Sequence, residues 1–120
     1  MIPPVTIVVR AWFYDQQDTA AYTSTIEKAG YEVSAPFQLK DGRINLDFEI
    51  YSADEFDQAE IESAVYDMKS RLNLPDGKMP SQSWIVVRMH TNAWYALNID
   101  RKLIGALNSM NTQLSVENRS

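Results

Sequence analysis

The sequence predicts a single α+β domain. Five segments alternate apolar and polar residues with the period of a β-strand, and three others repeat apolar residues three or four apart, as amphipathic helices do. The dipeptide Asp41-Gly42 lies between two alternating segments and is a strong signal for a β-hairpin. A chain of 120 residues with 45% hydrophobic and 22% charged residues has the size and composition of one globular domain. We place this domain in residues 1–114 and expect a polar tail over residues 115–120.

The first half of the chain predicts a strand, a helix and a second strand. Val5–Tyr14 is rich in β-branched and aromatic residues and places its apolar side chains on one face. Thr19–Ala29 has helical spacing, and Gly30 follows at the position where a helix often ends. Tyr31–Lys40 alternates again. Because Pro36 cannot donate a ladder hydrogen bond, we expect this strand at a sheet edge.

A hairpin and the longest helix are predicted next. Asp41-Gly42 fits a two-residue turn in which both residues take positive φ, and it leads into an alternating strand from Arg43 to Ile50. A helix is expected over Asp54–Leu72. Ser52 and Glu55 have the spacing of a capping box, in which each side chain satisfies a backbone N–H at the start of a helix.

The last third predicts strands over Ser83–His90 and Trp94–Ile99 and a helix over Asp100–Leu114. The first six elements then follow the order β-α-β-β-α-β, which is typical of the split βαβ, or ferredoxin-like, arrangement. An additional C-terminal strand and helix would extend the sheet, and the helix would cover an edge or part of the second face.

Aromatic and arginine side chains share the less hydrophobic phase of the predicted strands. In a ferredoxin-like sheet the first and fourth strands are neighbours, so these residues would merge into one surface. Trp, Tyr and Arg dominate the hot spots of protein interfaces, and aromatics on an open sheet also stack RNA bases. Packing of the third helix on this face, which would make the aromatics ordinary core, is a further alternative. The candidate partner-binding residues are Arg10, Trp12, Tyr14, Trp84, Arg88, His90 and Trp94.

Acidic residues gather in the middle of the chain. The segment from Asp41 to Asp67 contains nine acidic residues and one basic residue, within a net charge of −5 for the whole chain. Such a segment disfavours phosphate backbones and speeds association with a basic protein, although a solvated helix face that keeps the chain soluble explains it as well. The acids expected to steer a basic partner are Asp54, Asp57, Glu60 and Glu62.

Several chemistries find no support in the sequence. The chain has no cysteine and one histidine, which excludes thiolate metal sites and thiol nucleophiles, and no phosphate-binding loop or catalytic motif is present. Asp47 and Glu49 form the one carboxylate pair on a strand face, and ion pairing with Arg10 or Arg43 explains the pair more simply than catalysis does. We expect no cofactor and no metal, and we expect a cytoplasmic protein, because no apolar run approaches the ~20 residues of a membrane span.

Two stretches carry a resemblance to known families. Residues 83–88, 92–100 and 103–108 together resemble the strand–strand–helix ending of an uncharacterised bacterial family linked with toxin-immunity proteins. Its expected Thr-x-x-Leu-Gly helix end is replaced here by residues 27–30. Gly30-Tyr31-Glu32-Val33 before an acidic helix is similar to the acidic inhibitor family of ribonuclease E. Both resemblances imply binding or inhibition rather than catalysis.

These observations predict a small acidic protein-binding module of the immunity, antitoxin or inhibitor type. Its partner would be a basic toxin or a nucleic-acid-processing enzyme, and pairing with a second copy of the chain is left open. Three alternatives remain: a phage-type counter-defence inhibitor whose carboxylates imitate phosphates, a sheet that binds a ligand or RNA, and an enzyme with an unrecognised site.

Overall fold

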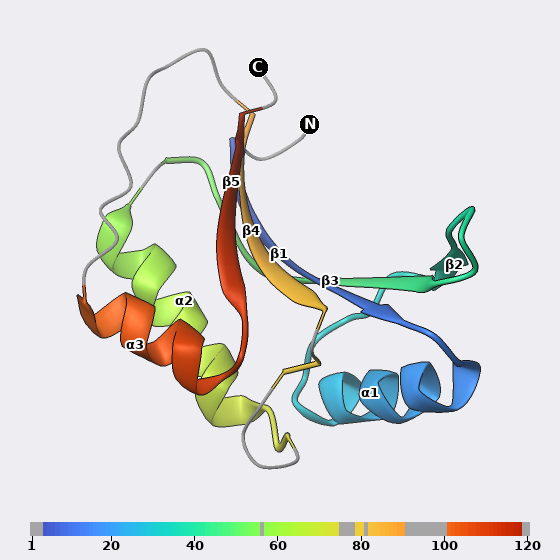
Figure 1. The fold of residues 1–120 in the computed structure, drawn as a ribbon. Coiled ribbons are helices and arrows are strands. Elements are labelled where there is room, and N and C mark those ends of the chain that lie inside the picture. Colours follow the sequence, from blue (N-terminus) through green and yellow to red (C-terminus); the bar gives the residue numbers. More distant parts are fainter. Residues whose placement is uncertain (1–3, 56, 75–78, 81, 91–100, 119–120) are drawn as a thin grey trace.

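The computed structural model describes residues 4–55, 57–74, 79–80, 82–90 and 101–118. They form an α+β fold in which one five-stranded mixed sheet carries three helices (Figure 1). None of the described helices has the length and apolar character needed to cross a bilayer. The elements are β1 (Val5–Phe13), α1 (Gln16–Lys28), β2 (Phe37–Gln38), β3 (Ile44–Ala53), α2 (Gln58–Arg71), β4 (Ser83–Met89), α3 (Arg101–Ser109) and β5 (Gln113–Asn118).

The strand order is β2-β3-β1-β4-β5, so β1 is the middle strand. It pairs antiparallel with β3 on one side and with β4 on the other. β2 pairs antiparallel with β3, and β5 pairs parallel with β4. A β-bulge interrupts the pairing of β1 with β3 between Ile7 and Val8, because Ile7 lies opposite Tyr51 and Val8 opposite Glu49.

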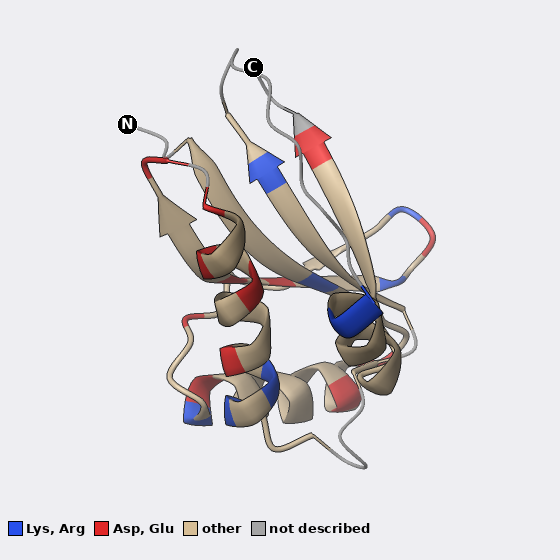
Figure 2. Cartoon of the chain, turned by 90° about the vertical axis from the view of Figure 1, so that its left-hand side faces the viewer, with Lys and Arg blue, Asp and Glu red and all other residues tan. Residues whose placement is uncertain are grey.

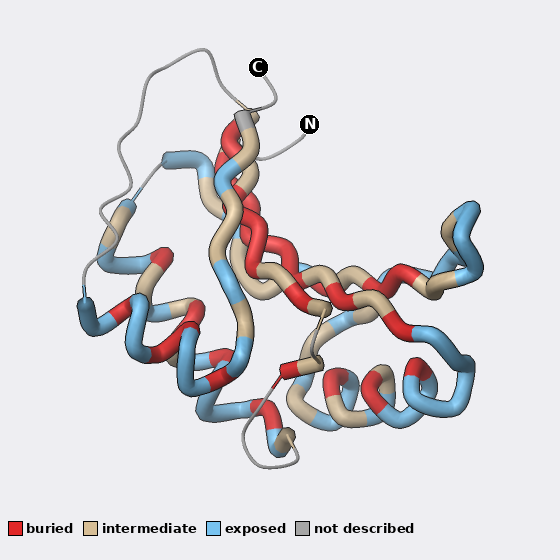
Figure 3. Tube along the Cα trace, in the orientation of Figure 1, coloured by how far each residue is buried: buried red, intermediate tan, exposed pale blue. Residues whose placement is uncertain are grey.

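All three helices pack on one side of the sheet, and the opposite side carries none of them (Figure 1). The core cluster joins the predicted apolar face of β1 with Ile26 of α1, Val65 of α2 and Leu107 of α3. Because residues of α3 belong to this core, α3 does not cover the aromatic side of the sheet. Burial is continuous over Val5–Val9 of β1 and Ile85–Val87 of β4, whereas each helix has one buried stripe (Figure 3).

The prediction of β1 is confirmed in its start and its phase, and the strand ends at Phe13, one residue before the predicted Tyr14. The apolar side chains of one phase are at most 9% exposed, and they face the helices. β-Branched and aromatic residues fit this position because they pack well on a pleated surface buried against other elements. These side chains are Val5, Ile7, Val9, Ala11 and Phe13.

The strand expected over Tyr31–Lys40 is reduced to two residues, and an isolated bridge joins Val33 to Phe48. β2 lies at the sheet edge, as the adjoining Pro36 predicted. The hairpin is present, but its loop is longer than predicted. The N–H of Leu39 donates to the carbonyl of Arg43 at 2.7 Å, which leaves three loop residues, and only Gly42 of them has positive φ, at 94°.

The start of α2 depends on an aspartate rather than on the predicted capping box. β3 continues to Ala53, which pairs with Val5, so Ser52 lies in the strand and caps no helix. Asp57 caps α2 instead and accepts hydrogen bonds from the N–H groups of Ala59 and Glu60. Strand pairing with β1 thus displaces the start of α2 from the predicted Asp54 to Gln58.

The C-terminal prediction was wrong after Ser109. Asn111 takes positive φ (57°) and ends the helix region, and residues expected to continue the helix or form a polar tail make β5 instead. Leu114 was assigned to a helical stripe because it lies four residues after Met110, but it packs on the core from β5. The strand expected over Trp94–Ile99 lies outside the described residues.

Replacement of the capping residue tests the observed start of α2. We expect Asp57→Ala to lower the free energy of unfolding by about 1 kcal/mol, because two backbone N–H groups lose their acceptor. Urea denaturation of Ser52→Ala provides the control, since Ser52 is exposed and lies in β3. A greater loss in Ser52→Ala than in Asp57→Ala would restore the capping box.

Candidate functional site

The helix-free side of the sheet brings together most of the predicted aromatic and arginine residues. We call this surface, centred on Arg10, Trp12, Trp84 and Arg88, the tryptophan face. Arg10 lies directly opposite Trp84 across the β1–β4 pair, and Arg88 lies opposite Thr6. The register of β1 and β4 therefore places their aromatic and arginine side chains on one surface, as predicted.

The two tryptophans contact each other at the centre of this face. Their ring centroids are 4.6 Å apart with planes inclined by 65°, which is an edge-to-face arrangement. The guanidinium carbon of Arg43 lies 4.0 Å from the centroid of the Trp12 ring. Both tryptophans are half-buried, so each is held in place while part of it remains accessible.

A chain of side-chain hydrogen bonds fixes the orientation of Trp12. Its Nε1–H donates to Oδ1 of Asn45 at 2.8 Å, and Nδ2 of Asn45 donates to Asp47 at 3.1 Å. Asp47 also accepts two hydrogen bonds from Arg10, at 3.0 and 3.1 Å. The bidentate pairing with Asp47 raises the pKa of Arg10. Asn45 is 2% exposed, and this chain supplies the partners that a buried amide requires.

Sequence reasoning identified Trp12, Arg10 and the carboxylate Asp47, but not the role of Asn45. Alternation in β3 marked Asn45 as an outward polar residue, and a surface position needs no partner. The signal that identifies it is its register opposite Trp12, which depends on the bulge and the hairpin loop. The contact of Arg43 with Trp12 was likewise invisible before the strands were paired.

Arg10 and Arg88 of the tryptophan face, and Arg43 beside it, are each paired with a carboxylate. Arg10 pairs with Asp47, Arg88 with Glu117 at 3.3 Å, and Arg43 with Asp41. Hydrogen bonding from Arg43 holds the pKa of the Asp41 carboxyl below its ordinary value. The three guanidinium charges are therefore balanced locally, although the arginines keep their planar surfaces and their remaining N–H donors.

Two small valines lie between the long side chains. Val8 and Val86 are opposite each other on β1 and β4 and are 8% and 4% exposed, respectively. They are outside the core cluster and are flanked along their strands by Arg10, Trp84 and Arg88. The accessible surface of the face is thus made mainly by the longer aromatic and charged side chains.

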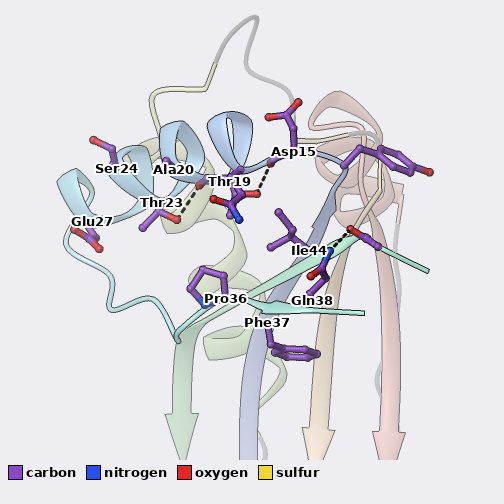
Figure 4. A pocket seen from close by; sticks show the side chains of 13 residues that line it. Asp15, Thr19, Ala20, Thr23, Ser24, Glu27, Pro36, Phe37, Gln38 and Ile44 are labelled. Carbon is purple, nitrogen blue, oxygen red and sulfur yellow. Dashed lines mark hydrogen bonds between the residues drawn. The ribbon is translucent and has the colours of Figure 1, made fainter. Parts of the chain in front are cut away.

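Tyr14 extends the face toward a groove. Its ring is 74% exposed and its hydroxyl accepts a hydrogen bond from Gln82 at 3.0 Å. The groove has a volume of about 670 Å³ and lies between α1 and the β2–β3 hairpin (Figure 4). In the close-up, Thr19 and Thr23 form the wall on α1 while Pro36 and Gln38 form the wall on the hairpin.

The polar groups of the groove are mostly engaged within the chain. The hydroxyls of Thr19 and Thr23 donate to helix carbonyls, at 2.8 Å each, and the Asp15 carboxylate caps α1. The Asp15 charge also raises the pKa of the nearby Asp18. Asp15 and Glu27 line the groove together with apolar side chains and without any Lys or Arg, so it suits an apolar or cationic group better than an anion.

The acidic residues predicted to bind the same partner lie on the other side of the molecule. They lie in α2 and in the connection before it, on the helical side of the sheet (Figure 2). Asp57 caps α2, Glu60 accepts a hydrogen bond from the Tyr51 hydroxyl, and Glu62 accepts one from Gln58. Asp54 is exposed in the connection. The structure therefore does not unite the acids and the tryptophans in one surface.

His90 and Trp94, the other two residues predicted for this surface, are not among the contacts described above. His90 follows β4, is half-buried, and donates its backbone N–H to the carbonyl of Pro4 at 2.6 Å. Trp94 lies outside the described residues. The described part of the tryptophan face therefore contains two of the three predicted tryptophans.

The carboxylate pair on β3 is placed as the ion-pair interpretation predicted. Both oxygens of Asp47 are engaged by Arg10, and Glu49 lies two residues further along the strand, opposite Val8. Within the described ranges no group of three His, Asp or Glu side chains has the arrangement of a metal site. The geometry at Asp47 favours a structural role.

Comparisons with known proteins add no relative. No family model matches the sequence, and no curated protein and no solved structure matches it either.

A double-mutant cycle tests the tryptophan contact. We expect Trp12→Ala and Trp84→Ala each to destabilise the fold, with a coupling free energy of about 1 kcal/mol between them because of their edge-to-face packing. Urea denaturation of the wild type, the two single variants and the double variant gives this value. Additive effects would mean that the two rings do not interact in solution.

The hydrogen bond between Tyr51 of β3 and Glu60 of α2 changes the pKa of the tyrosine. Burial, together with the hydrogen bond to Glu60 and the charge of that carboxylate, raises the pKa of Tyr51 to about 12. We expect Glu60→Gln to lower this pKa while leaving it above the ordinary value of about 10, since burial remains. NMR titration of the tyrosine rings measures it, and Glu62→Gln is the control because Glu62 pairs with Gln58 instead. An unchanged Tyr51 pKa in Glu60→Gln would contradict the contact.

Proposed function

We propose that the chain is a non-catalytic protein-binding module that contacts its partner through the tryptophan face. In this proposal it acts in the cytoplasm as a regulator of the immunity, antitoxin or inhibitor type. The observation that carries the proposal is the helix-free side of the sheet, which presents ordered tryptophan and arginine side chains. Such residues dominate binding energy in protein interfaces when they are held before binding and need little further ordering.

The pairing of the arginines supports a protein partner over a nucleic acid. Affinity for a phosphate backbone comes largely from cations that replace condensed counterions. Arg10, Arg43 and Arg88 already have carboxylate partners, so the face offers little net positive charge. Moreover, Arg43 lies over the ring of Trp12, where a stacked base would have to lie.

The acidic side of the molecule has a separate part in this proposal. Asp54, Asp57 and Glu60 are exposed on the helical side and would raise the rate of encounter with a basic protein. Because they lie away from the tryptophan face, they would affect association more than the lifetime of the complex. A nucleic-acid-processing enzyme or a basic toxin has the complementary charge.

The finer description of the fold is part of the same proposal. We propose a ferredoxin-like core for β1 to β4, with α1 and α2 on one side and the α3–β5 unit as an extension. The order β2-β3-β1-β4 and the antiparallel pairing within these four strands support it. β5 extends the sheet beyond β4 and thereby enlarges the tryptophan face.

Matched arginine variants test the binding surface. Arg88 on the tryptophan face and Arg71 on α2 each pair with a carboxylate, Glu117 and Asp67, respectively. A partner is first captured from cells that produce the protein, and its affinity for purified variants is then measured by calorimetry. We expect Arg88→Ala or Tyr14→Ala to weaken binding about tenfold or more, and Arg71→Ala to change it less than about twofold.

The same variants separate the proposal from its alternatives. Equal losses in Arg71→Ala and Arg88→Ala, or a loss in Arg71→Ala alone, would overturn the assignment to the tryptophan face. Fluorescence anisotropy with a labelled single-stranded oligonucleotide tests the RNA-binding alternative. Binding that weakens steeply with added salt and is lost in Tyr14→Ala would replace the protein-binding proposal with nucleic-acid binding.

A further inference from the structure

The two edges of the sheet differ in how well they resist further pairing. At one edge, β2 has only two residues and adjoins Pro36, so it offers a short and interrupted ladder. At the other edge, β5 has six residues, Gln113 to Asn118, and contains no proline and no lysine. Among the described residues β5 pairs with β4 alone, which leaves the outer edge of its backbone without a strand partner.

An exposed apolar region lies along this second edge. Val116 of β5 is 49% exposed and Ile104 of α3 is 44% exposed. Val116 is opposite the fully buried Val87 and therefore points to the helical side of the sheet, where α3 packs. A strand added to β5 would cover Val116 and extend the backbone ladder of the sheet at the same time.

We propose that β5 pairs antiparallel with β5 of a second copy of this chain, which makes one continuous ten-stranded sheet. The two-fold axis of such a pair is perpendicular to the sheet, so residues that lie opposite each other must point to the same side. Gln113, Ser115 and Glu117 point to the tryptophan face, and Leu114 and Val116 point to the helices. In an allowed register, an odd-numbered residue therefore lies opposite an odd-numbered residue of the second copy, and an even-numbered residue opposite an even-numbered one.

One allowed register makes the strand complementary to itself. With Ser115 opposite Ser115 of the second copy, Leu114 lies opposite Val116 on the helical side, and Gln113 lies opposite Glu117 on the tryptophan face. The apolar residues then meet each other twice, and each carboxylate meets an amide instead of a second carboxylate. Arg88 keeps its ion pair with Glu117, because that contact is made within one chain. Moving the register by two residues places Leu114 opposite Asn118 and Val116 opposite itself, so a single apolar pair replaces the two.

Charged residues at the two edges test this pairing. Sedimentation velocity over a wide range of protein concentration should show a reversible monomer–dimer equilibrium for the wild-type chain. Val116→Lys should abolish the dimer, since it places a charge in the new ladder at a position that is already half-exposed in the monomer. Phe37→Lys is the matched control, because Phe37 is 54% exposed on the opposite edge, and it should leave the dimer unchanged.

Single cysteines test the register, since the chain contains no cysteine of its own. Ser115→Cys places two thiols opposite each other at the two-fold axis, within the Cα separation that a disulfide spans. Gln113→Cys places its two thiols four residues apart along the ladder. Mild oxidation should therefore link Ser115→Cys into a covalent dimer much faster than Gln113→Cys.

Two results would overturn the proposal. One is a wild-type chain that stays monomeric at the highest concentration, and the other is a Ser115→Cys variant that crosslinks no faster than Gln113→Cys. If a monomeric chain loses a captured partner on Val116→Lys, a strand of that partner occupies the edge instead of a second copy. None of these results affects the assignment of the tryptophan face, because Arg88→Ala and Tyr14→Ala test it separately.

Discussion

The structure depends on β1 having two different sides. One side contributes Val5, Ile7 and Val9 to a core shared with all three helices, and the other presents Arg10 and Trp12. Since β1 has a neighbour along both of its edges, its backbone hydrogen bonds are satisfied within the sheet. Its two faces can therefore differ in composition. The helices cover the apolar face, so the aromatic and arginine side chains of the other face remain accessible.

The exposed side of the sheet is polar in composition but close to neutral in charge. Each guanidinium has a carboxylate beside it, and Trp12 is fixed through Asn45 and Asp47. Preorganisation of this kind lowers the entropy lost on binding, because the side chains already occupy one arrangement. The strongest unbalanced charge is in the connection before α2 and in the first half of that helix, on the helical side of the sheet, where residues 54–62 carry five acids and no base (Figure 2). In the proposed complex, long-range attraction would therefore come from one side of the molecule and close contact from the other.

Strong local patterns predicted the fold where nothing competed with them. The alternation in β1 fixed its buried face, and Pro36 predicted an edge. The capping box at Ser52 failed because pairing of β3 with β1 continues through that residue, and strand pairing is invisible in a local pattern. β5 was missed because it has only two apolar residues, and Leu114 also fits the helical spacing that precedes it. In the site, the residue types were predictable but their contacts were not, since Asn45 meets Trp12 only through the register.

The central place of β1 also has a consequence for biosynthesis. A ribosome delivers β1 first, but the two strands beside it begin only at Ile44 and Ser83. The emerging chain must therefore keep its most apolar strand unpaired on one edge until β4 has been made, and β4 begins at Ser83, 70 residues after β1 ends at Phe13. Contacts over such long stretches of chain are slow to form because a large loop has to close. The nascent protein is thus most vulnerable to aggregation just before β4 arrives.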